Sequence, residues 1–181
     1  MTLARLVEFR AAIDAPWTHF EPVRLGAVPP APPVPPAPDR YVLLTEGGMP
    51  ALRLDLYCDL DHSEREDATF VGDWLAVGYG ARVHLVSLSL PRPRAPRSIQ
   101  LRSYFCGFFA LPTERALLVA SGEDVTLIDR TGRIAWTSPM LAVDGVQIER
   151  VRGDYIEGVG EHAPPGDCRP FRIRLADGTV A

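Results

Sequence analysis

The chain has 181 residues, of which 46% are hydrophobic, and a formal net charge of −4. This composition predicts a globular protein of ordinary domain size and excludes extensive disorder. The acidic balance gives no reason to expect nucleic acid as a partner. No stretch approaches the roughly 18 apolar residues that a membrane helix needs, and charged residues interrupt the N-terminal segment where a signal peptide would be apolar. We therefore expect a cytoplasmic protein without a membrane partner.

The N-terminal segment, residues 3–13, has apolar side chains at helical spacing. They are Leu3, Leu6, Val7 and Ala11. This pattern predicts a short amphipathic helix that ends before Pro16, since proline cannot continue a helix.

Prolines dominate residues 28–39 and predict a polyproline II arm, because proline fixes φ and removes backbone donors. The arm is either a stiff spacer or a PxxP ligand for an aromatic groove. The expected organisation is an N-terminal helix and loop over residues 1–27, a proline-rich linker over 28–39, and a β-repeat domain over 40–181.

From residue 40 onward, the sequence predicts strands joined by glycine-containing turns. Hairpins are expected at Tyr41–Tyr57 and Asp73–Leu90, a buried aromatic strand at Ser103–Leu111, and an Asp-Gly turn at Asp177 in the last segment. His84 falls at an outward position of the second hairpin, which predicts a surface residue. The basic segment Arg92–Ser98 contains prolines and is expected to be an exposed loop.

The second hairpin recurs later in the chain after a shift of 42 residues, from Leu75 to Leu117. The matching positions are Leu75, Val77, Gly80, Val83 and Leu85, which recur as Leu117, Val119, Gly122, Val125 and Leu127. Such a unit has a strand, a glycine reversal and a strand that returns to the same core.

A degraded third copy contains Ile156, Gly158 and Gly160 in one strand and Phe171, Ile173 and Leu175 in the returning strand. The hairpin Tyr41–Tyr57 is a candidate fourth copy. Units of about 40 residues are typical of β-propeller blades. The predicted fold is therefore all-β, a small or incomplete β-propeller-like meander of hairpin repeats with a short N-terminal helix and a polyproline arm. A generic β-meander is the alternative.

The segment VTLIDRTGRIAW, Val125–Trp136, resembles blades of WD-like and PQQ-like propellers, in which a strand leads through a D-x-x-G turn to a tryptophan. The last 75 or so residues look like a group of small bacterial proteins with propeller-like repeats, some of which act as immunity proteins against toxins. Their recurring features are W-x-S, L-A-x-D-G-V, G-x-G-E and P-P-G followed by P-F. Because Trp136 is the only blade-ending tryptophan, the resemblance implies no quinone, and we expect no cofactor.

Acidic residues are concentrated between Tyr57 and Asp67. The candidate partner-binding residues are Asp59, Asp61, Glu64, Glu66 and Asp67. This segment is predicted to be a solvated acidic loop, or a negative patch that steers a basic protein partner. Cys58 and His62 match no defined zinc spacing, and the segment lacks the glycine of a calcium loop, so we expect no metal.

Two main classes of function remain open, and a third possibility is a scaffold whose polyproline arm engages another protein. The first is a non-enzymatic protein-binding module, most concretely an immunity protein that occludes the active site of a basic toxin domain. The second is a small hydrolase that uses carboxylates, or Cys168 as nucleophile with His162 as its base. Asp129, before the turn of the clearest repeat, is expected to bind local backbone rather than to catalyse. The sequence favours the non-enzymatic class and leaves the oligomeric state open.

Overall fold

The computed structural model describes residues 4–27, 36–58, 65–89, 95–111, 113 and 115–181. Strands dominate these residues, and the helical element among them is one 3-10 turn, Trp17–His19. The chain forms two compact units, Met1–His62 and Ser63–Ala181, which we call unit 1 and unit 2 and describe separately. The domain limits expected at residues 27 and 39 remain a prediction.

Unit 1 is one sheet with the strand order β1-β3-β4-β2. Its strands are β1 (Arg5–Arg10), β2 (Val23–Gly26), β3 (Arg40–Glu46) and β4 (Met49–Tyr57). Strands β3 and β4 form the expected hairpin, while β2 pairs with β4 in parallel. Of the expected polyproline arm, residues 28–35 lie outside the described part of the chain. Tyr57 Oη donates to the Pro36 carbonyl at 3.4 Å.

The N-terminal helix expected over residues 3–13 is wrong, because Arg5–Arg10 in the middle of this segment form strand β1. β1 pairs antiparallel with β3, which places Arg5 opposite Glu46 and Arg10 opposite Tyr41. The apolar residues of so short a segment satisfy helical spacing and a half-buried strand equally well. Pairing with β3, which is distant in the sequence, decides between helix and strand. Local periodicity contains no information about this pairing.

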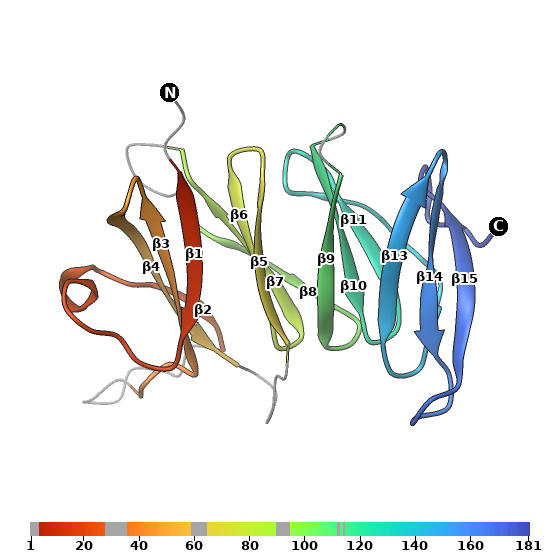
Figure 1. The fold of residues 1–181 in the computed structure, drawn as a ribbon, viewed down its shortest axis with the longest axis horizontal. Coiled ribbons are helices and arrows are strands. Elements are labelled where there is room, and N and C mark those ends of the chain that lie inside the picture. The colour runs from red at the N-terminus through yellow and green to blue at the C-terminus, as the bar shows by residue number, and fades with distance from the viewer. Residues whose placement is uncertain (1–3, 28–35, 59–64, 90–94, 112, 114) are drawn as a thin grey trace. The chain divides into compact units, whose positions relative to one another are not determined.

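Unit 2 contains three sheets. The first has β5 (Glu66–Val71), β6 (Trp74–Tyr79), β7 (Arg82–Ser87) and β8 (Arg97–Gln100). The second has β9 (Phe105–Leu111), β10 (Ala116–Ser121), β11 (Val125–Ile128) and β12 (Ile134–Thr137). The third has β13 (Val146–Arg152), β14 (Tyr155–Glu161) and β15 (Cys168–Arg174). Each sheet is an antiparallel meander in chain order (Figure 1).

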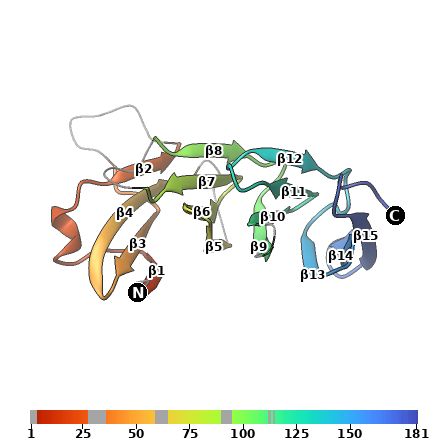
Figure 2. The ribbon, with the colours of Figure 1, turned by 90° about the horizontal axis from the view of Figure 1, so that it is seen from above.

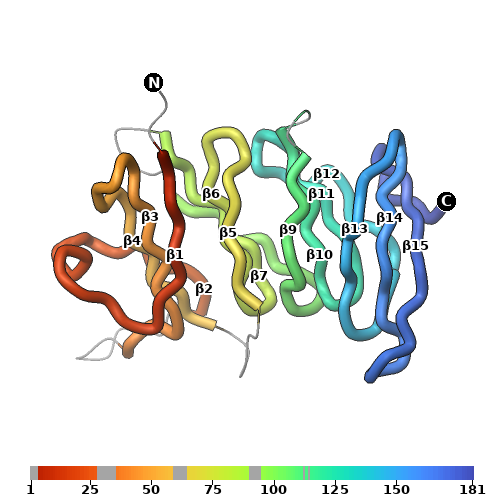
Figure 3. Tube along the Cα trace, viewed as in Figure 1, coloured from red at the N-terminus to blue at the C-terminus, as the bar shows by residue number. Residues whose placement is uncertain are grey.

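The first strands of the three sheets, β5, β9 and β13, are neighbours within unit 2 (Figure 3). Figure 2 shows the later strands of the first two sheets following in order, from β5 to β8 and from β9 to β12. In propeller blades, the first strands lie next to one another and each meander leads away from its first strand, as it does here. The fold is thus all-β and β-propeller-like, as the sequence predicts.

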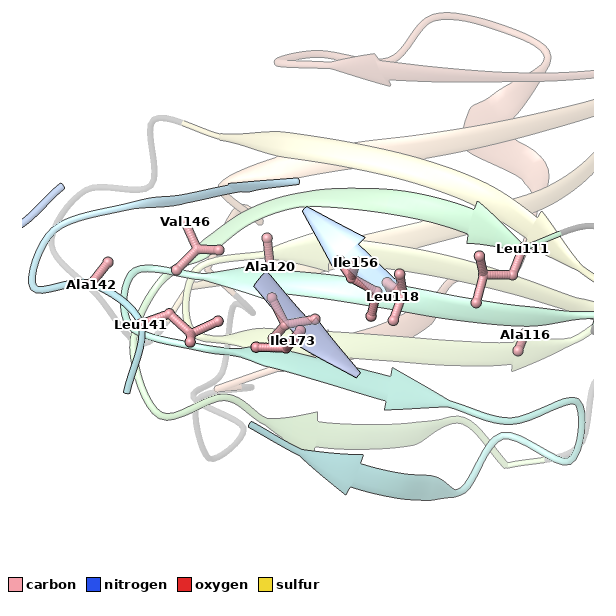
Figure 4. Close-up of a cluster of buried hydrophobic side chains, with 10 residues drawn as sticks. Leu111, Ala116, Leu118, Ala120, Leu141, Ala142, Val146, Ile156 and Ile173 are labelled. Carbon is pink, nitrogen blue, oxygen red and sulfur yellow. The ribbon is translucent and has the colours of Figure 1, made fainter. Parts of the chain in front are cut away.

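Apolar side chains fill the spaces between successive sheets of unit 2. One cluster joins the first two sheets and includes the buried Phe105, Leu117 and Val83. A second joins the second and third sheets and includes Leu118, Ile156 and Ile173 (Figure 4). β10 contributes to both clusters, since its alternate side chains point to opposite faces of the sheet.

The predicted repeat is confirmed at the level of strands. The first copy spans β6 and β7, the second β10 and β11, and the third β14 and β15. In each copy these are the second and third strands of one sheet. The candidate fourth copy in unit 1 is the β3–β4 hairpin.

The structure corrects two predictions about the first sheet of unit 2, the first in full and the second in part. His84 is 2% exposed, and its Nδ1 lies 2.8 Å from Ser98 Oγ. Both faces of β7 are covered, so alternation along the strand does not separate core from solvent there. The expected loop Arg92–Ser98 ends in strand β8, whose first residue is Arg97, and its residues 92–94 lie outside the described part.

Candidate functional site

The acidic residues chosen from the sequence fall partly outside the described chain. Asp59, Asp61 and Glu64 lie there, so their expected role stays a prediction. Glu66 and Asp67 are exposed and begin strand β5, which corrects the expectation that the acidic segment is loop throughout. Asp67 Oδ1 accepts a hydrogen bond from the Ala68 backbone N–H at 2.8 Å.

Arg65, the single basic residue of that segment, directly precedes β5 and lines two adjoining cavities. Its Nη1 donates to the Cys106 carbonyl at 3.3 Å and so attaches the start of β5 to β9. The larger cavity, of about 280 Å³, is lined by Arg65, Cys106, Gly107, Phe108, Ala120, Val146, Gln147 and Ile148. The smaller, of about 110 Å³, is lined by Arg65, Asp144, Gly145, Val146, Gln147, Val159, Glu161 and Cys168. We call the two together the β9–β13 groove.

The groove is lined by a mixture of polar and apolar groups, and its carboxylates lie in the smaller cavity. Arg65 and Gln147 border both cavities, while Asp144 and Glu161 add carboxylates to the smaller one. Glu66 and Asp67, the first residues of β5, directly follow Arg65 in the chain. When they are counted with the lining of the groove, acidic side chains outnumber basic ones among the described residues. Such an arrangement suits a partner with a basic side chain and an apolar neighbour.

Hydrogen bonding fixes the carboxylate of Asp144. Tyr104 Oη donates to Asp144 Oδ1 at 2.6 Å. Burial, followed by this hydrogen bond to a carboxylate, raises the pKa of Tyr104 above its ordinary value. Tyr104 therefore stays protonated at neutral pH and remains a donor that orients Asp144.

The thiol of Cys106 is unsuited to nucleophilic chemistry. Burial raises the pKa of Cys106, because the thiolate would lose hydration. The side chain thus lines the larger cavity as a neutral, weakly polar group.

The Cys168 and His162 pair expected for a hydrolase flanks the turn between β14 and β15. Cys168 is exposed and is the register partner of Glu161. In the part of the chain that the structure describes, no hydrogen bond joins the His162 ring to Cys168 Sγ. Asp167, the nearby carboxylate, binds Arg169 at 2.6 Å instead of orienting His162. This geometry does not form a nucleophile and base pair.

No group of three or more metal-ligating side chains occurs among the described residues. His62 lies outside them, so the expectation that Cys58 and His62 bind no metal stays a prediction. The described part of the chain contains no helix that is long and apolar enough to cross a membrane.

Sequence reasoning missed Arg65, Asp144 and Gln147 as parts of one site. They come from positions before β5, before β13 and within β13, and only the packing of first strands brings them together. The sequence did contain one signal for this site, which is Arg65 itself. A single arginine within an acidic run is expected to bind a specific neighbour.

No protein-family model and no curated protein matches the chain. Among solved structures, the WD40 domain of Neurospora crassa Pan2 aligns with 11% sequence identity and a TM-score of 0.44, over 75% of this chain and 46% of that domain. The chain thus spans less than half the length of that domain. We assign the fold from the sheet topology described above, and no family follows from the match.

Proposed function

We propose that this chain is a non-enzymatic protein-binding module, and specifically a bacterial immunity protein that neutralises a cognate toxin by occluding its active site. The observation that carries the proposal is the β9–β13 groove, which Arg65 lines together with carboxylates and apolar side chains. Glu66 and Asp67 lie exposed beside Arg65, and Asp144 and Glu161 line the smaller cavity.

The charge of this region favours a basic partner. Carboxylates clustered on one surface raise the local concentration of a positively charged protein and speed its association. Asp59, Asp61 and Glu64, which precede Arg65 in the chain, extend the same negative charge in the proposal. A toxin with a basic substrate cleft would present the complementary surface.

A binding role also fits the side chains that line the groove. Cys106 is held as a neutral thiol, and Asp144 is engaged by Tyr104. Neither is arranged as a nucleophile or general base, whereas both help to form a fixed surface. Pre-organised side chains of this kind reduce the entropy lost on binding.

The test uses the full chain and the basic toxin domain encoded beside it. We expect a tight complex whose association rate constant falls steeply with added salt. The double variant Glu66→Gln/Asp67→Asn should associate about fivefold more slowly at low ionic strength, with a smaller change in dissociation. Stopped-flow fluorescence measures both rate constants.

A matched control removes two exposed acids elsewhere, Glu21→Gln and Asp154→Asn. This control should associate at nearly the wild-type rate. The proposal fails if the neighbouring gene product does not bind, or if both double variants slow association equally.

A further inference from the structure

The third sheet of unit 2 has two chemically different faces. One face packs against the second sheet through Val146, Ile156 and Ile173, all buried. The opposite face carries four arginines on its flanking strands, two on β13 and two on β15, around Tyr155 and Glu157 of β14. The arginines are Arg150, Arg152, Arg172 and Arg174, all exposed. We call this set the basic face.

The strand register arranges the basic face in rows. Arg150 and Arg172 lie on either side of Glu157 in one row. Arg152 and Arg174 lie on either side of Tyr155 in the next row. Since neighbouring strands are about 4.8 Å apart, each pair of arginines spans about 10 Å across the central strand.

The first row already holds a carboxylate. Arg150 Nε lies 2.7 Å from Glu157 Oε2, and Arg172 Nε lies 3.6 Å from Glu157 Oε1. The side chain of Glu157 is 22% exposed, against 64% for Arg150 and 52% for Arg172. Two guanidinium groups thus bind one carboxylate from opposite sides, as arginine does at carboxylate-binding sites.

The second row has the same cations without the carboxylate. Arg152 and Arg174 make no ion pair with any residue that the structure describes, and Tyr155 stands where Glu157 stands in the first row. Like charges across a strand repel one another, so an external anion between them would be favourable. The neighbouring row, where Arg150 and Arg172 bind the Glu157 carboxylate, indicates that this anion is a carboxylate.

We propose that the basic face is a docking surface for an acidic protein segment, which places an aspartate or glutamate side chain between Arg152 and Arg174, next to the Arg172 guanidinium that covers the Tyr155 ring. The site is separate from the β9–β13 groove and takes a partner of opposite charge. It therefore does not depend on the function proposed above.

One feature of the basic face favours a protein carboxylate over a nucleic acid strand. The Arg172 guanidinium lies 3.7 Å from the centre of the Tyr155 ring and covers the surface on which a base would stack. A carboxylate on a side chain can enter one row without crossing the other.

The test is a fluorescence anisotropy titration of the full chain with a fluorescein-labelled peptide of ten glutamates at low ionic strength. The wild-type chain should bind this probe with an affinity that falls as salt is added. The variant Arg152→Glu/Arg174→Glu should lose affinity by about tenfold or more, and Arg152→Gln/Arg174→Gln should lose less. All three chains should show the same thermal unfolding, because the substituted side chains are exposed.

The matched control, Arg130→Glu/Arg133→Glu, makes the same change in charge at exposed positions in the turn between β11 and β12. It should bind within about twofold of wild type if the surface, rather than net charge, determines affinity. A nitrogen–proton NMR titration should place the largest shifts in residues 150–157 and 172–174.

Three results would overturn the proposal. The first is no binding of the glutamate peptide by the wild-type chain. The second is an equal loss in the Arg130/Arg133 control, or shifts centred elsewhere. The third is tighter binding of a ten-nucleotide oligothymidine than of the peptide, which would identify a nucleic acid surface instead.

Discussion

Asp129 and Asp177 occupy corresponding positions in turns of neighbouring sheets. Asp129 follows β11, and Asp177 follows β15, each the third strand of its sheet. Asp129 Oδ1 accepts hydrogen bonds from the Thr131 N–H at 2.8 Å and the Thr131 hydroxyl at 2.7 Å. Asp177 Oδ1 accepts the same pair from Thr179 at 3.0 and 2.6 Å. The expectation that Asp129 binds local backbone is confirmed, and the turn is held by a side chain in both repeats.

The Asp129 turn predicts a dependence of stability on pH. Burial alone would raise the pKa of Asp129, but the hydrogen bonds from Thr131 and the Arg133 N–H outweigh it and lower the pKa. Because the folded pKa lies below the unfolded value of about 3.9, the stabilisation is complete above that value. It is lost as the pH falls through the folded pKa. Asp129→Ala should therefore lower the free energy of unfolding by about 1 kcal/mol at neutral pH and by less in acid. Urea denaturation at several pH values measures this difference.

Asp129→Asn separates charge from hydrogen bonding, since the amide oxygen still accepts. We expect it to cost less than the alanine variant at neutral pH and to lack the acid dependence. A constant difference between wild type and Asp129→Ala down to strongly acidic pH would contradict the assigned role of the ionised carboxylate.

At the scale of elements, tryptophans of the first and second sheets of unit 2 contact the glycine turn of the sheet that follows. Gly132, in the turn after β11, lies against Trp74 of the first sheet. Gly178, after β15, lies against Trp136 of the second. Trp136 Nε1 also donates to the Leu175 carbonyl at 3.0 Å. The turn glycine and the tryptophan, noticed in the sequence as parts of one repeat, thus connect neighbouring sheets within unit 2.

Substitution of Gly178 tests this contact. A Cβ there would lie 2.5 Å from the Trp136 ring, and its φ of +73° is unfavourable for a residue with a side chain. Gly153→Ala is the matched control, since Gly153 has a φ of +57° and no atom within 4 Å of an added Cβ. We expect Gly153→Ala to cost about 1 kcal/mol and Gly178→Ala about 1–3 kcal/mol more, as measured by chemical denaturation.

A double-mutant cycle isolates the contribution of the ring. In a Trp136→Ala background, Gly178→Ala should cost no more than Gly153→Ala does, because only backbone strain remains. An unchanged cost of Gly178→Ala in that background would show that the ring contact is not responsible.

The sequence predicted hairpins well where strand and turn are adjacent in the chain. The shift from Leu75 to Leu117 identified equivalent strands because the same core position selects the same residue type in each sheet. It failed at β1, whose partner β3 is separated from it by the proline-rich segment. Local patterning records which side chains are apolar and not which distant strand they pair with.

For the whole molecule, the candidate site was harder to predict than the fold. The β9–β13 groove combines Arg65, Cys106 and Gln147 from three different sheets or their borders. The packing of first strands alone brings these residues together, and no spacing in the sequence encodes it. The acidic segment was visible as composition, whereas the groove beside it and the arginine rows of the third sheet required the strand register.

The two apolar clusters lie wholly within unit 2, and this predicts that Ser63–Ala181 folds without the rest of the chain. Expressed alone, this fragment should give β-type circular dichroism and a single cooperative unfolding transition, because each of its three sheets retains a neighbour. The shorter fragment Ser63–Thr137 is the control. It loses Val146, Ile156 and Ile173 and so leaves the buried Leu118 and Val125 facing water. We expect it to unfold at lower denaturant concentration or to aggregate, since exposing several buried aliphatic side chains costs about 1.5–3 kcal/mol each. If the fragment Ser63–Ala181 showed no cooperative transition, unit 2 would need unit 1 to fold.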